Sequence, residues 1–162
     1  MFATQVNREL MPFSKNTIED TTMAFIWDNN LETGHNHIDN QHRMLFNTLQ
    51  RLGSSCRDGS GHDELVRTVE FLNAYTLKHF ADEEKLQVLH DYPDYQEHKR
   101  YHDDFSRVVR ELSGQLLQEG ASYSLVHTVY GTIGDWLLHH IKGEDFKMAA
   151  YMQRSVHARR NA

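Results

Sequence analysis

The chain contains an ordered series of side chains of the types that bind metal ions. Five histidines and two acidic residues make up this series: His42, His79, Glu83, His98, His102, His140 and Asp145. His79 with Glu83, and His98 with His102, are pairs spaced four residues apart, and residues at this spacing share one face of a helix. Imidazole combined with carboxylate suits iron, zinc, copper or nickel. The series therefore predicts metal ions held between helices.

The joint arrangement carries more weight than any single pair. With 12 histidines in 162 residues, about one His-x-x-x-His pair is expected from composition alone. Here, however, each group falls on a different predicted helix and interrupts an otherwise apolar, inward-facing stripe. Burying such groups costs several kcal/mol unless they are paired or bound to metal. A metal-free core of hydrogen-bonded histidines is the alternative, and the number of groups argues against it.

A count of ligands predicts one open coordination position. If both carboxylates and a solvent-derived oxygen bridge two metal ions, an ion with three histidines has six ligands and is closed. An ion with two histidines has five ligands, and an open position distinguishes a reactive site from a structural one. Bridging carboxylates in a helical bundle favour di-iron, whereas ferritin-like oxidases use mostly glutamates with Glu-x-x-His spacing. We expect two non-haem irons that bind a small molecule, O2, at one iron.

The elements that position these residues are predicted to be helices. Helical periodicity extends from Asp39, taken as an N-cap residue, to the turn region 53–59, from about Asp63 to Leu89, from Pro93 to Gly120, from Ser122 through His140, and in a shorter tail helix over 146–152. The short connections predict an all-α, up-down-up-down antiparallel four-helix bundle. The domain prediction is a polar N-terminal arm over 1–23, the bundle over 24–156 and a basic tail over 157–162.

The remaining aromatic residues and histidines are predicted to lie away from the chemistry. We expect Phe25 and Trp27 to pack over one end of the bundle. His35 and His37 precede the first helix and are weaker, alternative ligands. His139 is expected to face away from the site, and four further histidines are interpreted as surface residues: His62, His90, His127 and His157.

Composition excludes several classes of partner. The net charge is −6 and no basic patch dominates, so nucleic acid is not an expected partner. No stretch approaches the roughly 20 apolar residues that span a bilayer, so no membrane role is expected. Cys56 is the only cysteine, which excludes an internal disulfide and favours a reducing, cytoplasmic location.

The second carboxylate presents a geometric ambiguity. Asp145 lies five residues after His140, which is about 140° around an ideal helix. Glu144, four residues after His140, would lie on the better face, and ideal geometry slightly favours it. The alternative is a π-bulge or helix break near Gly143 that brings Asp145 inward, and such bulges are frequent at functional sites.

The ordered pattern resembles the hemerythrin family, the bacteriohemerythrins in particular. The resemblance rests on four motifs: Ile38-Asp39-x-Gln41-His42, His79-x-x-x-Glu83, His98-x-x-x-His102 and His140-Ile141-x-x-x-Asp145. It covers about residues 27–152 and implies that Asp145 is the bridging residue. It also implies that His98, His102 and His140 bind one iron, that His42 and His79 bind the other, and that the second iron has the open position.

The functional expectation follows from this resemblance. It implies reversible O2 binding at two non-haem irons bridged by an oxo or hydroxo group and two carboxylates, with Leu137 as an apolar residue shielding the bound O2. The expected role is oxygen transport, storage or delivery without enzymatic turnover. One alternative is an O2-sensing or redox-sensing input module that acts on a signalling partner of unknown identity. A second alternative is a weak peroxidase, ferroxidase or nitric-oxide reductase.

Overall fold

All regular elements in the described part of the chain are helical. The computed structural model describes residues 25–58 and 60–160, and the predicted arm over 1–23 lies outside them. The elements are η1 (Asn29–Leu31), α2 (Asn36–Asp58), α3 (Gly61–Leu89), α4 (Tyr95–Glu119), α5 (Tyr123–His140), η2 (Ile141–Asp145) and α6 (Phe146–Arg160). Here η1 is a 3₁₀ turn and η2 is a π-helical turn.

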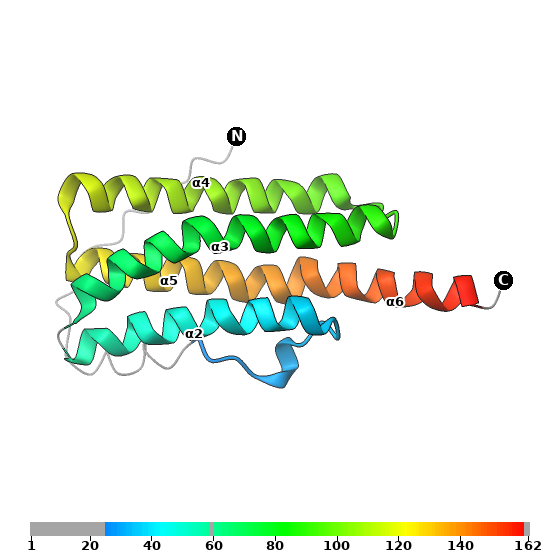
Figure 1. Ribbon diagram of the computed structural model, residues 1–162, viewed down its shortest axis with the longest axis horizontal. Helices are drawn as coiled ribbons and strands as arrows, with labels where there is room; N and C mark the ends of the chain where they lie inside the picture. The colour runs from blue at the N-terminus through cyan, green and yellow to red at the C-terminus, as the bar shows by residue number, and fades with distance from the viewer. Residues whose placement is uncertain (1–24, 59, 161–162) are drawn as a thin grey trace.

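The long helices form the predicted four-helix bundle. Around the bundle, α2 packs against α3 and α5, and α4 packs against the same two helices. Figure 1 shows that α5, η2 and α6 form one continuous rod, which is the fourth helix of the bundle. The predicted short tail helix is therefore an extension of the fourth helix. It continues to Arg160, beyond the predicted end at residue 152 and into the predicted basic tail.

The first long helix begins earlier than expected. It starts at Asn36, so Asp39 lies in its first turn and does not cap it. The Asp39 carboxylate instead accepts hydrogen bonds from the backbone N–H groups of Thr33, at 2.8 Å, and Gly34, at 3.1 Å. Gly34 has a φ of +83°, in the left-handed region that favours glycine. Asp39 thus fixes the loop that leads into α2, and the predicted ligand His42 lies one turn further along the same helix.

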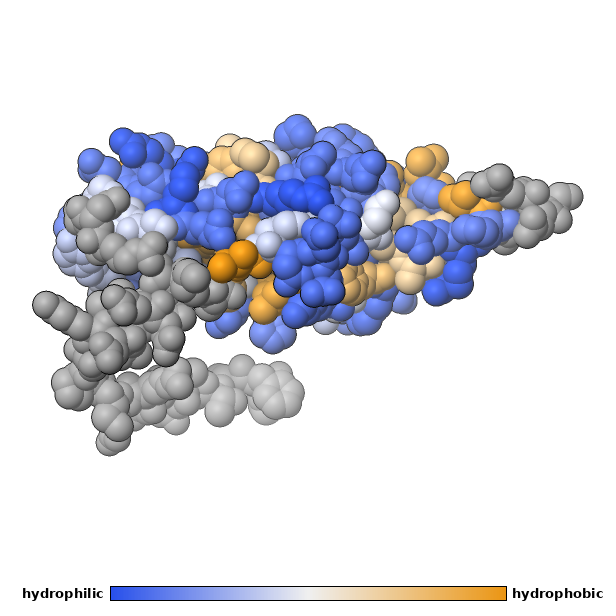
Figure 2. All heavy atoms as spheres, turned by 90° about the horizontal axis from the view of Figure 1, so that it is seen from below, coloured by the Kyte–Doolittle hydropathy of each residue, from blue (hydrophilic) through white to orange (hydrophobic). Residues whose placement is uncertain are grey.

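An apolar core fills the space between the helices, and it excludes water from the polar residues within it. Its fully buried members come from α2, α3, α4 and the α5 rod, and include Leu45, Phe46, Leu49, Leu65, Phe105, Val129, Ile133 and Ile141. The face shown in Figure 2 is mainly hydrophilic, with hydrophobic side chains in separate patches. No helix within residues 25–58 and 60–160 has the length and apolar character needed to cross a membrane.

Phe25 attaches the start of the described chain to α5. Its ring lies 5.1 Å from the ring of Tyr130, and it packs directly over Gly134. A Cβ atom added at Gly134 would be 2.2 Å from the Phe25 ring, much closer than any real contact. Gly134 is therefore required by this close approach.

We expect Gly134→Ala to reduce the free energy of unfolding by about 1–3 kcal/mol, the usual cost of overpacking a core. Gly131→Ala is the matched control, because it lies one turn earlier on α5 and an added Cβ there meets nothing within 4 Å. The control should be neutral or more stable by up to about 1 kcal/mol, from helix propensity. Urea unfolding measures both changes, and equal stabilities for the two variants would contradict this packing.

Candidate metal centre

The seven predicted ligand residues meet in the middle of the bundle. His42 comes from α2, His79 and Glu83 from α3, His98 and His102 from α4, His140 from α5 and Asp145 from η2. Each of the seven residues is at most 5% exposed. Two overlapping groups of their ligand atoms are close enough to hold an ion: Glu83, His98, His102 and His140 form one, and His42, His79 and Glu83 form the other.

The Glu83 carboxylate lies between the two groups of histidines. Its Oε1 atom is 3.6 Å from His42 Nε2 and 3.4 Å from His79 Nε2. Its Oε2 atom is 3.6 Å from His98 Nε2 and 3.1 Å from His102 Nε2. One oxygen therefore faces the two-histidine group, and the other faces the three-histidine group.

The two carboxylate oxygens of Asp145 also face different groups of histidines. Its Oδ2 atom is 3.2 Å from His42 Nε2, whereas its Oδ1 atom is 3.3 Å from His98 Nε2 and 3.2 Å from His140 Nε2. Neighbouring ligand atoms of one metal ion, with bonds of about 2.1 Å, are about 3 Å apart. Both carboxylates thus have the arrangement of bridges between two metal ions.

The π-turn decides which acidic residue enters the centre. In η2 (Ile141–Asp145) the extra residue of each π-turn returns Asp145 to the face of His140, and Asp145 is fully buried. Glu144 points away and pairs with Lys147 at 2.7 Å, at the edge of a polar surface pocket. The preference for Glu144 from ideal helix geometry is therefore wrong, because the helix is not ideal at this point. The π-bulge alternative is confirmed.

Most donor atoms of the centre lie near one another as histidine–carboxylate pairs but make no hydrogen bond of acceptable geometry with the described residues. Both oxygens of Glu83, both oxygens of Asp145, and the Nε2 atoms of His42, His98, His102 and His140 are buried without a hydrogen bond of acceptable geometry. Leaving so many polar and charged atoms unsatisfied in a core would cost several kcal/mol each. Two metal ions coordinated by imidazole and carboxylate would satisfy them all. The residues present therefore fit a dinuclear centre.

Electrostatics keeps the carboxylates ionised. Burial by itself would raise the pKa of Glu83 and of Asp145, but the surrounding imidazoles hold both well below their usual range. Burial would likewise lower the pKa of His42 and of His98, but contacts with the same two carboxylates outweigh it and raise each to about 9. For His79 burial dominates and lowers the pKa to about 4, so this imidazole is neutral near pH 7.

Two of the histidines have an outer hydrogen-bond partner. His79 Nδ1 is 3.0 Å from Gln41 Oε1, and His102 Nδ1 is 3.1 Å from Glu84 Oε1. Gln41 belongs to the motif that indicated the family, but its role was not predicted. Glu84 was also missed, since a residue next to a ligand on a helix usually points elsewhere.

Aromatic rings cover the histidines of the three-histidine group. Phe80 stacks on His102, with ring centroids 3.9 Å apart and planes 8° from parallel. Trp136 stacks on His140 at 4.3 Å and 19°. Helical spacing could have found Trp136, because it precedes His140 by four residues. Phe80 directly follows His79, and its contact with His102 on another helix arises only when the helices pack. These rings restrict rotation of the imidazoles and keep water from them.

Trp27 lies closer to the centre than expected. Its ring centroid is 6.1 Å from that of His42 and 5.7 Å from that of Phe46, and the Arg43 guanidinium lies 5.1 Å from the ring. Phe25 does pack on the bundle away from the ligands, over Gly134. The prediction that both aromatic residues avoid the chemistry is therefore wrong for Trp27, which covers His42.

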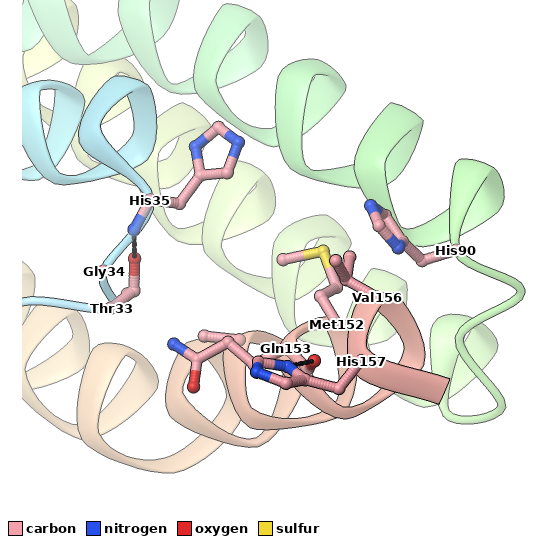
Figure 3. A pocket seen from close by; sticks show the side chains of 9 residues that line it. Thr33, Gly34, His35, His90, Met152, Gln153, Val156 and His157 are labelled. Atoms are coloured by element: carbon pink, nitrogen blue, oxygen red, sulfur yellow. Dashed lines mark hydrogen bonds between the residues drawn. The ribbon is translucent and has the colours of Figure 1, made fainter. Parts of the chain in front are cut away.

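The alternative ligands lie outside the centre. His37 is exposed and contacts Asp82 at 3.1 Å. His35 lines an apolar surface pocket of about 240 Å³ between the loop before α2, the end of α3 and α6, as Figure 3 shows. His90 lines the same pocket and is half-buried, as is His127, so these two are less exposed than predicted. His62, His139 and His157 are exposed, as expected.

We expect Asp145→Asn to prevent stable binding of two irons, because an amide supplies only one good ligand oxygen and no charge. Glu144→Gln is the matched control at the neighbouring position and should retain both irons. Anaerobic loading with Fe²⁺, removal of free metal and determination of iron per chain measures the difference, with circular dichroism as a check on folding. Two irons in Asp145→Asn and fewer in Glu144→Gln would reverse the assignment.

The raised pKa values of His42 and His98 predict opposite effects of pH on stability and on metal binding. Protonation of these groups stabilises the metal-free fold below pH 6.5, and this contribution is lost as pH rises through about 9. The Tm of the metal-free protein should therefore fall between pH 7 and pH 9, while metal affinity rises because fewer protons must be displaced. Scanning calorimetry and metal titration at several pH values test this, and a metal-free Tm that rises over this range would contradict it.

Comparison with known proteins agrees with this geometry. The family model named "Hemerythrin HHE cation binding domain" matches residues 33–152 of this chain. A hemerythrin chain of Sipunculus nudus is 31% identical over 76% of this chain and 89% of its own length. Bacteriohemerythrin of Pseudomonas aeruginosa is 30% identical over 82% of each chain, and myohemerythrin of Riftia pachyptila is 26% identical over 76% of this chain and 89% of its own. Because these matches extend over nearly all of the bundle that carries the centre, the chain belongs to the hemerythrin family, which binds O2 at a non-haem di-iron centre.

Proposed function

We propose that this protein binds O2 reversibly for oxygen transport, storage or delivery, without turnover of a substrate. The proposed iron ligands are His98, His102 and His140 for one iron and His42 and His79 for the other, with Glu83 and Asp145 shared between them. A pair of ferrous ions in this site would supply two electrons and a coordination position for O2.

The observation that carries the proposal is the unequal division of donors. Three imidazole Nε2 atoms and two carboxylate oxygens face one side of the centre, which gives five protein donors. Two Nε2 atoms and two carboxylate oxygens face the other side, which gives four. With one solvent-derived bridge, an octahedral site is complete on the first side and keeps one position free on the second. A small ligand would therefore bind on the side of His42 and His79.

The surroundings favour binding over further oxidation. Histidines bind metal as neutral imidazoles, so five of them make the ligand set less anionic than a glutamate-rich set. This stabilises high oxidation states less well. Leu137 is 1% exposed and lies one turn before His140. We assign to Leu137 the exclusion of water from the ligand position, and Trp27 covers His42 from the outside. Restricted access of water and protons should slow irreversible oxidation of the loaded site.

The direct test is an anaerobic titration of the reduced, iron-loaded protein with O2, followed by visible absorption. The expected result is an absorption band that saturates at one O2 per two irons and disappears on purging. Rapid, irreversible oxidation without such a band would count against a carrier and favour redox sensing or an enzyme. Failure of the folded chain to bind iron at all would contradict the metal centre itself.

A second function, O2 sensing, is supported by one feature of the fold. Asp145 lies in η2, which continues directly into α6, and Figure 1 shows α6 extending past the ends of the neighbouring helices. A shift of Asp145 on ligand binding would be transmitted along this rod to whatever partner contacts it. Hydrogen exchange of α6 with and without O2 separates the two functions, since a carrier needs no change there.

A further inference from the structure

Gln41 is a buried polar residue that the ligand assignment leaves without a role. It directly precedes His42 on α2 and is 3% exposed. Its Oε1 atom lies 3.0 Å from His79 Nδ1 on α3, and its Nε2 atom donates to Asp82 Oδ2 at 2.8 Å. One amide thus joins a proposed iron ligand to a carboxylate at the surface.

The orientation of this amide follows from the chemistry of Asp82. An ionised carboxylate only accepts hydrogen bonds, and Asp82 is held in that form by His37, at 3.1 Å, and by two lysine side chains, each at 3.3 Å. The NH2 group of Gln41 must therefore face Asp82, which leaves its carbonyl oxygen facing His79. His79 must then carry its proton on Nδ1 and present the lone pair of Nε2 to the centre.

We propose that Gln41 is a positioning residue that fixes the tautomer and ring orientation of His79, and thereby controls occupancy of the iron with the open position. The inference rests on the proposed assignment of His79 as an iron ligand. Outer partners of metal-bound histidines orient the ring and make it a stronger ligand. Here the same turn of α2 supplies one ligand, His42, and positions the other.

The two sides of the centre differ in this outer contact. His102, in the three-histidine group, pairs directly with the carboxylate of Glu84, which in turn contacts Lys99 at 3.4 Å. His79 pairs with a neutral amide. The two-histidine group also has fewer imidazoles, so misorientation of His79 removes half of them. Loss of the Gln41 amide should therefore weaken binding of the iron on the side of His79 and leave binding of the other iron unchanged.

The test compares Gln41→Leu, which keeps the approximate shape but cannot form hydrogen bonds, with Glu84→Gln as the control on the other side. Anaerobic binding isotherms for Fe²⁺ should show one iron bound as in the wild type and the second weakened by about 10–100-fold in Gln41→Leu. Glu84→Gln should leave the affinity of the second iron unchanged. Wild-type affinity for both irons in Gln41→Leu would overturn the proposal, and so would equal weakening of both irons with a lower Tm, which would indicate a role in helix packing.

A spectroscopic readout separates orientation from packing. In the Zn²⁺-loaded, ¹⁵N-labelled protein, the His79 Nδ1 proton should give a slowly exchanging NMR signal that disappears in Gln41→Leu. The His102 signal should remain. Persistence of the His79 signal in this variant would contradict the role of Gln41.

Exchanging the amide and the carboxylate between positions 41 and 82 should restore binding of the second iron. Gln41→Glu alone places two carboxylates 2.8 Å apart and should weaken the second iron as Gln41→Leu does. Combined with Asp82→Asn, it moves the amide to α3 and keeps an acceptor facing His79, so binding of two irons should return. Failure of the double variant to restore the second iron would overturn the proposal. If the wild type itself binds fewer than two irons, the proposed function fails; if only the variants deviate from expectation, the inference alone fails.

Discussion

The structure depends on two ionised carboxylates buried in the middle of a helical bundle. Glu83 and Asp145 are fully buried, and each directs one oxygen toward His42 and the other toward His98. A buried carboxylate is tolerated only where positive charge compensates it. Imidazoles from all four long helices surround this pair, so the site and the bundle are stabilised by the same contacts. Two metal ions held by both carboxylates and the histidines would provide the compensation that hydrogen bonds in the described residues do not.

The second constraint is the interruption of the fourth helix. His140 and Asp145 can face one point only if the helix gains a residue between them, and the π-turn η2 provides it. Without this π-turn, Asp145 would lie on a different face of the helix from His140. The same turn joins the centre to α6 without a break in the rod. A local adaptation to metal binding is thereby connected to an element that extends beyond the bundle.

The surroundings of the two histidine groups are unequal. The three-histidine group is covered by the stacked rings of Phe80 and Trp136 and contacts the charged Glu84. The two-histidine group is covered by Trp27 and contacts the neutral amide of Gln41. A group with fewer ligands and a neutral outer partner is better suited to exchange a small ligand, whereas the other is suited to remain closed. The function proposed for the chain follows from this difference.

The sequence by itself determined the helical bundle and which residues form the candidate centre. Apolar periodicity and short connections are local features that specify antiparallel helices, and the i, i+4 spacing of His79 with Glu83 and of His98 with His102 directs each pair to one place. Only the tertiary structure decided between Glu144 and Asp145, because the choice depends on a π-turn that ideal helix geometry does not contain. Tertiary structure also decided the contacts of Gln41 with His79, of Trp27 with His42 and of Phe25 with Gly134. Each of these contacts joins residues far apart in the chain, and their proximity arises only when the helices pack together.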